Sequence, residues 1–303
     1  MRPNERLVIL DSNSILHRAF HALPLLTTRK GEPVNAVYGF FLVLFKIIKE
    51  IQPDSIAACF DFPAPTFRHD RFKEYKAKRP PTPKDLVSQI PKIKEVLKSL
   101  SVSFFEREGF EADDLIATIA QKARDEVSEI FILTGDFDTL QIVDEKTKIF
   151  FLGRKIKEPL IYNEKKVIEE FKVLSKQIPD YKALVGDQSD NIPGVSGIGP
   201  KTAVEILSHY KNLDDFYNKQ KTENKLKVEI KEKLVKNKEK IFLSRELVKL
   251  KDNVPIDFDL TKCRFGNFSQ TEFEEVLKKF EFYSLLKRVP EIVQTTDKVK
   301  KLF

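Results

Sequence analysis

Three apolar runs of this 303-residue chain each end in an aspartate: LVILD (7–11), SIAACFD (55–61) and IFILTGD (130–136). Short runs of this kind predict buried strands of a parallel sheet. Their carboxylates would lie at the carboxyl edge of that sheet, where ligands bind in open α/β folds. The runs therefore predict an α/β fold with an acidic ligand site.

The segments between these runs carry helical patterns. Apolar spacing predicts a helix over about 37–48, another over 83–100 that bends at Pro91, and a third over 112–126. SVSFFE (101–106) adds a strand. This β-α-β-α order predicts a mainly parallel central sheet flanked by helices, which we assign to residues 1–175.

A second, helical region is predicted for residues 176–288, followed by a frayed tail over 289–303. Its marker is the segment DNIPGVSGIGPKTAVEIL (190–207). Pro200 breaks a P-loop pattern, so a helix–hairpin–helix whose GIG turn grips a phosphate fits better. A plain connection between two helices is the other explanation. The Lys-rich run 219–240 predicts a solvated helical face, with DNA contact as a second possibility.

Nine acidic residues gather in five short segments. GFEADDL (109–115), TGDFDTL (134–140) and GDQSDN (186–191) hold most of them, and helix capping or turn formation explains each segment singly. An extended backbone after the strand would aim Asp136 and Asp138 the same way. At about 5 Å and an effective dielectric constant near 20, each like-charged pair costs roughly 3 kcal/mol. Mg²⁺ would relieve that repulsion, and we predict metal ligation by Asp11, Asp61, Glu111, Asp113, Asp114, Asp136, Asp138, Asp187 and Asp190.

Residues 62–85 combine cations with aromatic side chains directly after Asp61. Cations suit phosphates and aromatic rings suit bases, so the segment predicts a single-strand-binding surface over the acids. A mobile charged loop is the plainer alternative.

The net charge of +7 and a charged fraction of 33% favour a polyanionic partner, although a Lys-rich composition alone would give the same balance.

The longest apolar stretch is too short to cross a bilayer, and the N-terminus lacks the pattern of a secretory signal. Cys59 and Cys263 give neither a disulfide framework nor zinc-ligand spacing. His17 and His21 lack the glutamate of a zinc protease motif. We expect a cytoplasmic, nucleoid-associated monomer without a membrane partner.

Several segments together resemble one family. LDSNSILHRAFHAL, GEPVNAVYGF, FDFPAPTFRHDRFKEYKAKRPPTP, GFEADD, TGDFDTLQ, GDQSDNIPGVSGIGPKTA and EFYSLL are similar to the bacterial 5′-nuclease family, including the N-terminal nuclease domain of DNA polymerase I. The resemblance runs from about Leu7 to Leu286. It implies a PIN-like fold with a helix-3-turn-helix, and 5′-3′ exonuclease and flap endonuclease activity in DNA replication and repair. It leaves open a free-standing enzyme or an excised domain.

The resemblance also implies roles for individual residues. Asp11, Asp61, Glu111 and Asp113 look like ligands of a first metal, and Asp136, Asp138 and Asp190, with Asp113 shared, like those of a second. Asp114 and Asp187 match outer-shell acids. Arg68, Tyr75, Lys76 and Arg79 fall in the arch that grips a 5′ strand, where Lys76 and Arg79 would neutralise the reacting phosphate. Gly197, Gly199, Lys201 and Thr202 fall in the duplex-binding hairpin, where similar domains carry K⁺.

The implied cofactors are two Mg²⁺, with Mn²⁺ as a substitute. The implied substrates are 5′ flaps, nicked or gapped duplexes and RNA primer–DNA hybrids, with a DNA polymerase as a further partner. Two other readings stay open: a non-catalytic, structure-specific DNA-binding protein on the same fold, and an RNA nuclease of the toxin type. The second leaves the 190–207 hairpin unexplained.

Overall fold

A six-stranded sheet forms the centre of the computed structural model, which describes residues 5–152, 160–223 and 225–294. The strand order is β3-β2-β1-β4-β5-β6. All neighbouring pairs are parallel except β5 with β6, which confirms the predicted mainly parallel sheet. The strands are β1 (Arg6–Asp11), β2 (Ser55–Cys59), β3 (Ser103–Phe105), β4 (Glu129–Thr134), β5 (Thr147–Phe151) and β6 (Leu160–Tyr162).

The register brings the ends of the three central strands to one edge of the sheet. Asp11 of β1 pairs with Cys59 of β2, and Leu10 pairs with Leu133 of β4. Successive residues face opposite sides, so Leu7 and Ile9 enter one apolar core while Val8 and Leu10 enter the other. Burial on both faces explains why these strands are continuous apolar runs.

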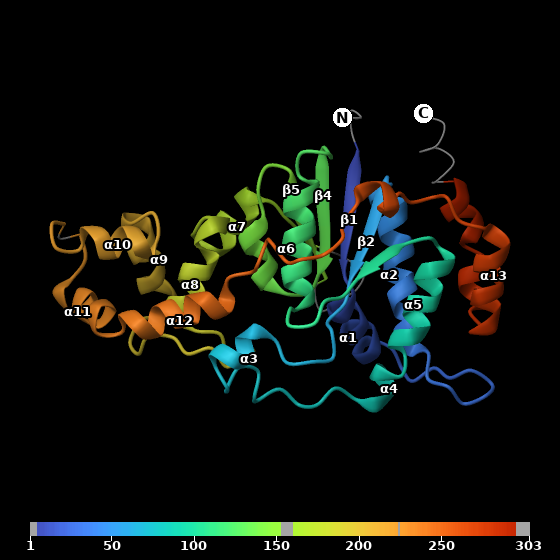
Figure 1. Ribbon diagram of the computed structural model, residues 1–303, viewed down its shortest axis with the longest axis horizontal. Helices are drawn as coiled ribbons and strands as arrows, with labels where there is room; N and C mark the ends of the chain where they lie inside the picture. Colours follow the sequence, from blue (N-terminus) through green and yellow to red (C-terminus); the bar gives the residue numbers. More distant parts are fainter. Residues whose placement is uncertain (1–4, 153–159, 224, 295–303) are drawn as a thin grey trace.

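Helices cover both faces of the sheet (Figure 1). On one side lie α2 (Asn35–Ile51) and α5 (Ile90–Ser99). On the other lie α6 (Ala112–Ala123) and α7 (Glu164–Phe171). The helix α1 (Ser12–Ala22) begins where β1 ends and packs closely on α2, where Gly39 leaves no room for a side chain against Ala19.

The single bent helix predicted over 83–100 is wrong. The chain forms α4 (Lys84–Val87) and α5 with a break at Gln89, and Pro91 lies in the first turn of α5, where its missing N–H costs nothing. The buried Gln89 side chain accepts hydrogen bonds from the backbone N–H groups of Ala36 (2.8 Å) and Val37 (3.2 Å) at the start of α2. Because the Val34 side chain cannot cap that helix, Gln89 satisfies these N–H groups instead.

A lobe of helices extends from one end of the sheet (Figure 1). It comprises α8 (Ile178–Val185), α9 (Pro200–His209), α10 (Leu213–Lys219), α11 (Val228–Lys236) and α12 (Lys238–Val248). The predicted hairpin is the turn that joins α8 to α9. The Lys-rich run 219–240 is helical over much of its length, as predicted, with a break between α11 and α12.

The predicted helical region does not stay together as far as residue 288. After α12 the chain returns along the sheet, and α13 (Gln270–Lys279) packs beside α5, far from the lobe in Figure 1. Phe273 lies 6.0 Å from Phe45 of α2, ring centre to ring centre. The short α14 (Tyr283–Leu286) follows. Apolar side chains after 250 thus complete the core of the α/β body.

The frayed tail predicted over 289–303 is wrong for its first residues. Val289 and Ile292 are 0% and 2% exposed and belong to the same core as α2 and α5. Residues 295–303 lie outside the described part of the chain. Within the described residues, no helix combines the length and apolar character needed to cross a membrane.

We expect Phe273→Ala to lower the free energy of unfolding by about 3–5 kcal/mol, because Phe273 is fully buried against the α/β core. Chemical denaturation followed by circular dichroism measures the change. Tyr283→Ala, at a 56% exposed aromatic side chain nearby, is the matched control. A loss below about 1 kcal/mol for Phe273→Ala would contradict the assignment of α13 to the α/β body.

Candidate functional site

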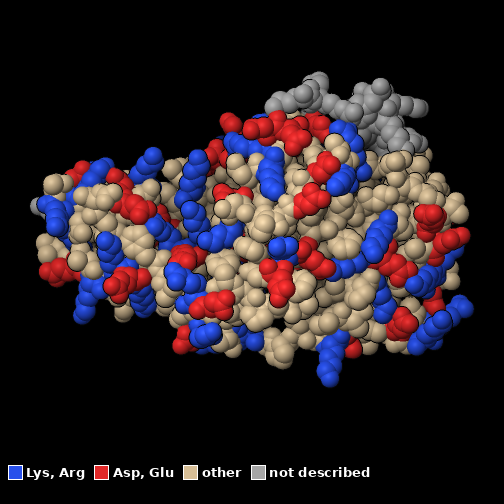
Figure 2. Space-filling model, viewed as in Figure 1, with Lys and Arg blue, Asp and Glu red and all other residues tan. Residues whose placement is uncertain are grey.

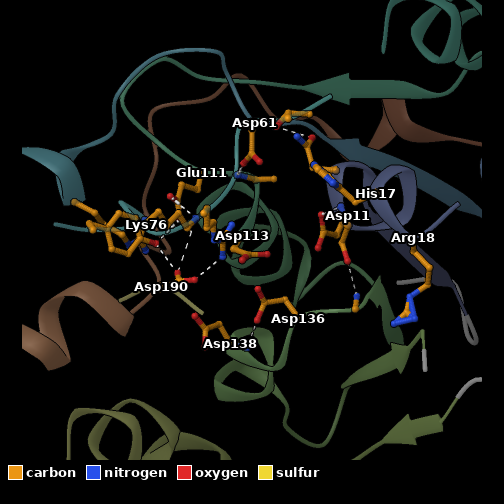
Figure 3. Close-up of a pocket in the computed structure, with 18 of the residues that line it drawn as sticks. Asp11, His17, Arg18, Asp61, Lys76, Glu111, Asp113, Asp136, Asp138 and Asp190 are labelled. Atoms are coloured by element: carbon orange, nitrogen blue, oxygen red, sulfur yellow. Dashed lines mark hydrogen bonds and ion pairs between the residues drawn. The ribbon is translucent and has the colours of Figure 1, made fainter. Parts of the chain in front are cut away.

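A cleft of about 670 Å³ opens at the carboxyl ends of β1, β2 and β4. Seven of the nine predicted acids line it, and Figure 3 shows their carboxylates around a common space. They come from strand ends, from the start of α6, from the turn after β4 and from the loop after α8. The seven are Asp11, Asp61, Glu111, Asp113, Asp136, Asp138 and Asp190.

The strand-end acids also organise the local backbone. Asp11 caps α1 by accepting a hydrogen bond from the Ser14 N–H (3.0 Å), and its other oxygen accepts one from the Thr134 hydroxyl (2.6 Å). Asp61 accepts a hydrogen bond from the Ala112 N–H at the start of α6 (2.7 Å). These hydrogen bonds cap the starts of α1 and α6, and they also direct the two carboxylates into the cleft.

Asp136 and Asp138 do not lie on the extended backbone that we predicted. The chain turns into a 3₁₀ helix, η1 (Phe137–Ile142), and the Asp138 N–H donates to the Asp136 carboxylate across 2.9 Å. The Thr134 hydroxyl oxygen accepts a hydrogen bond from the Asp136 backbone N–H (3.0 Å). The prediction of geometry is wrong because this local turn satisfies the N–H groups after the strand. Both side chains nevertheless line the cleft.

Asp113 lies at the electrostatic centre of the cluster. Its Oδ1 is buried and has no hydrogen-bond partner, an arrangement that is costly for a carboxylate. Burial, together with the charges of Asp11 and Asp136, raises its pKa well above the ordinary value. Burial likewise raises the pKa of Asp11 to about 7. A cation in this space would relieve both effects.

The donor set fits a hard divalent cation. It consists of carboxylate oxygens, one of them the buried, unpartnered Oδ1 of Asp113. In the described part of the chain, no three acidic, His or Cys side chains converge into a compact ligand set. Mg²⁺ suits such a spread arrangement, because it keeps several of its waters.

Two cations of the segment 62–85 reach into the same cleft. The Lys76 ammonium lies 2.7 Å from Glu111 Oε1, and Arg79 pairs with Asp190. The Lys76 N–H also donates to the Asp190 carbonyl (2.9 Å). The loop that carries Asp190 thereby holds this part of the chain over the acids, with Lys76 beside Asp190 in Figure 3.

Arg68 and Asp114 pair with each other inside the protein. The Arg68 side chain is 1% exposed and donates two hydrogen bonds, of 2.7 and 2.8 Å, to the fully buried Asp114 carboxylate. Asp114 also accepts from the backbone N–H groups of Glu111 and Lys251. These contacts hold Asp114 behind Glu111, a position that suits the outer-shell role implied by the resemblance. They also bury the Arg68 guanidinium, whose predicted contact with DNA stays a prediction.

Tyr75 and Asp187 also form contacts with neighbouring side chains of the protein. Tyr75 is 3% exposed, and its hydroxyl lies 2.9 Å from Asp190 Oδ2, so it holds Asp190 in place and offers no ring to DNA. Asp187 lies outside the cleft lining and forms an ion pair with Lys182 (2.7 Å). The five-residue separation of Lys182 and Asp187 in the sequence did not indicate this ion pair.

Among the lining residues that the sequence did not assign to the site are three basic side chains of α1: His17, Arg18 and His21. The rings of His17 and His21 stack 6.3 Å apart on α1. Burial, with His21 and Arg79 nearby, lowers the pKa of His17. The sequence could have indicated that these residues line the cleft, because they lie on α1, which Asp11 caps directly after β1.

The residues predicted to grip a duplex lie at the turn into α9, in the helical lobe. Gly197 has a φ of +77°, a left-handed conformation that favours glycine. Gly199 directly precedes α9, and Lys201 and Thr202 occupy its first turn. On the face of the helical lobe seen in Figure 2, Lys and Arg are interspersed with Asp and Glu, so that face is not uniformly basic.

Comparison with known proteins settles the family. Residues 6–172 match the 5′-3′ exonuclease N-terminal resolvase-like domain, and residues 173–271 match the 5′-3′ exonuclease C-terminal SAM fold. The chain belongs to the 5′-3′ exonuclease family.

Relatives and solved structures agree. A 5′-3′ exonuclease of Aquifex aeolicus is 38% identical over 94% of this chain and 96% of its own length. DNA polymerase I of Caldicellulosiruptor bescii is 40% identical over 95% of this chain, which spans about a third (34%) of that polymerase. The T5 D15 protein crystallised with metal ions has the same fold, with a TM-score of 0.69 and 21% identity over 95% of this chain and 100% of its own.

We expect Arg68→Ala to lower the free energy of unfolding by about 3–5 kcal/mol, because it leaves the buried Asp114 carboxylate without its partner. The matched control is Arg71→Ala in the same short helix, α3 (Phe67–Arg71), where an exposed ion pair with Glu246 is lost. Urea denaturation of both variants measures the difference. Equal losses would contradict the structural role of Arg68.

Proposed function

We propose that the protein is a Mg²⁺-dependent, structure-specific 5′ nuclease that hydrolyses phosphodiester bonds in 5′ flaps, nicked or gapped duplexes and RNA primer–DNA hybrids. The observation that carries this proposal is the unpartnered, buried oxygen of Asp113 amid six other acids, with Lys76 and Arg79 facing the same cleft. Family membership and the metal-bound T5 structure support it.

The acids divide between two metal sites in this proposal. Asp11, Asp61, Glu111 and Asp113 would hold one Mg²⁺, and Asp136, Asp138 and Asp190 would hold the other with Asp113, with Mn²⁺ as a substitute. When bound, the pair would supply a water nucleophile at neutral pH and stabilise the leaving oxygen. The orientation of Asp11 and Asp61 is fixed by the hydrogen bonds that cap α1 and α6.

Lys76 and Arg79 bring positive charge to the reacting phosphate. In the structure they contact Glu111 and Asp190, so their side chains already lie at the cleft. A phosphate that entered would replace those carboxylates as their partner. Charge-assisted contacts of this kind stabilise the transition state in phosphoryl transfer.

The hairpin before α9 would hold the duplex at a distance from the cleft. Gly197 and Gly199 allow a backbone phosphate to approach the N-terminus of α9, where Lys201 and Thr202 add side-chain contacts, and K⁺ would bind at this turn. Such contacts position DNA without reading its sequence. We further propose that the protein acts as a cytoplasmic, nucleoid-associated monomer in replication and repair, with a DNA polymerase as partner.

We expect wild-type protein to cut a 5′-labelled flap duplex with Mg²⁺ and to make no product with EDTA. Asp136→Asn should slow cleavage by more than about 100-fold, because even residues behind metal ligands cost 10–100-fold. Asp125→Asn, at an exposed acid outside the cleft, is the control and should cut normally. Tight flap binding without cleavage in Mg²⁺ or Mn²⁺ would instead identify a non-catalytic DNA-binding protein.

Lys201→Ala should weaken duplex binding to all sequences and reduce the slope of log affinity against log salt by about 1, since one phosphate contact is lost. Cleavage at saturating DNA should be unchanged, because Lys201 lies outside the cleft. Fluorescence anisotropy over a salt series measures the slope. The control is Lys278→Ala on α13, and an equal effect of the two variants would exclude the hairpin as the duplex site.

A further inference from the structure

A third apolar core, separate from the two larger cores on either face of the sheet, joins three distant parts of the chain. These parts are the segment 62–85, the loop between α8 and α9, and α12, and in Figure 1 the short helix of that segment, α3, lies beside α12. We call the six side chains of this cluster the small core. They are Phe72, Tyr75, Ile192, Leu243, Leu247 and Val248.

The small core anchors the segment 62–85 beyond its first helix. The structure describes every residue of this segment, and Tyr75 is its only buried aliphatic or aromatic side chain. All residues from Ala77 to Asp85 are exposed. Lys76 directly follows Tyr75 and has a φ of +55°, a left-handed conformation that a lysine keeps when its surroundings hold the backbone in place. The position of Lys76 therefore depends on the small core.

Two hydrogen bonds tie the loop between α8 and α9 into the same unit. The Asn191 side-chain amide donates to the Glu74 carbonyl of the segment (2.8 Å). On the other side, the buried Ser244 hydroxyl of α12 donates to the Pro193 carbonyl (2.7 Å). Both contacts flank Ile192 of the small core. Because each one ends on a backbone carbonyl, they fix the main chain of the segment and of the loop relative to each other.

The hairpin before α9 is attached to the α/β body by a different set of contacts. Val195 and Ile198 belong to the large core that also holds Leu7 and Ile9 of β1. Loosening the small core would therefore leave the hairpin and the strand-end acids in place. It would free the cations of the segment 62–85 to move relative to both.

We propose that the small core sets the position of the cut, because it fixes the span between the phosphate held at the hairpin and the phosphate that Lys76 and Arg79 contact. Successive phosphates of one strand lie about 3.4 Å apart along a duplex, so a shift of the cations by about half that spacing would serve two neighbouring phosphates equally well. The six side chains are positioning residues, and this inference rests on the proposed nuclease function.

The test is the length of the products from a 5′-labelled flap duplex cut with Mg²⁺, resolved to single nucleotides. Wild type should give one principal product. Leu243→Ala should raise the ratio of neighbouring products to the principal one by about 5–10-fold, which equals a loss of roughly 1–1.4 kcal/mol in positional preference. Leu243 lies outside the cleft lining and the hairpin, so binding of a duplex without a flap, measured by fluorescence anisotropy, should be unchanged.

The matched control is Leu42→Ala, the same substitution at another partly buried leucine. Leu42 lies on α2 and packs against one of the two larger cores. A loss of stability alone lowers the amount of active protein without changing product lengths, so Leu42→Ala should cut at the wild-type position. Equal broadening by Leu42→Ala and Leu243→Ala would overturn the role of the small core.

Phe72→Ala tests the opposite side of the small core. It should broaden the cut as Leu243→Ala does, and the double variant should fall short of the sum of the two effects, because both residues act through one cluster. Broadening by Phe72→Ala alone would assign Phe72 to DNA contact and overturn the inference. Should Leu243→Ala fail to fold by far-ultraviolet circular dichroism, Leu243→Val, which removes a single methylene, decides in the same way.

Unchanged product positions in a folded Leu243→Ala variant would overturn the inference while leaving the proposed nuclease function intact. Wild-type protein that cuts without positional preference would do the same. Wild-type protein that makes no Mg²⁺-dependent product would overturn the nuclease function itself. The same gel therefore distinguishes the two failures.

Discussion

The guanidinium of Arg68 and the carboxylate of Asp114 form a buried ion pair with two hydrogen bonds, and three distant parts of the chain meet there. Arg68 lies in α3, within the segment 62–85 that also carries Lys76 and Arg79. Asp114 lies in the first turn of α6. Arg68 also donates to the Leu247 carbonyl (2.7 Å), and Asp114 accepts from the Lys251 N–H (2.9 Å). The segment that carries Lys76 and Arg79, the start of α6 and the chain returning from the helical lobe are thus fixed to one another. Removing either partner of a pair this buried would leave an uncompensated charge inside the protein, which is strongly destabilising.

Electrostatic balance is the second constraint on the cleft. Seven carboxylates line the cleft, and cationic side chains of the protein form ion pairs with several of them. Lys76 pairs with Glu111, Arg79 with Asp190, and Lys182 with Asp138. Asp113 is different, because its buried Oδ1 has no partner and burial raises its pKa. The charge that remains uncompensated therefore lies at the centre of the cluster, where divalent cations are proposed to bind.

The sequence was sufficient for the sheet and for most of the acids, because a buried parallel strand is a continuous apolar run and its end marks the ligand edge. Individual roles were harder to predict. Arg68 and Asp114 are residue types that suit contacts with DNA and with metals, and the sequence gives no sign that they are buried against each other. The pairing of Lys182 with Asp187 and the return of α13 to the α/β body are tertiary contacts, which local patterns do not encode. The break at Gln89 likewise depends on the start of a distant helix.

Anomalous diffraction from crystals soaked in Mn²⁺ would test the two-metal site most directly, since it locates each ion independently of activity. We expect two Mn²⁺ in the cleft, with Asp113 between them, Asp138 on the second ion, and Asp114 outside both coordination shells. Crystals that bind no Mn²⁺ in the cleft, or that bind it at Asp114, would contradict the site described above.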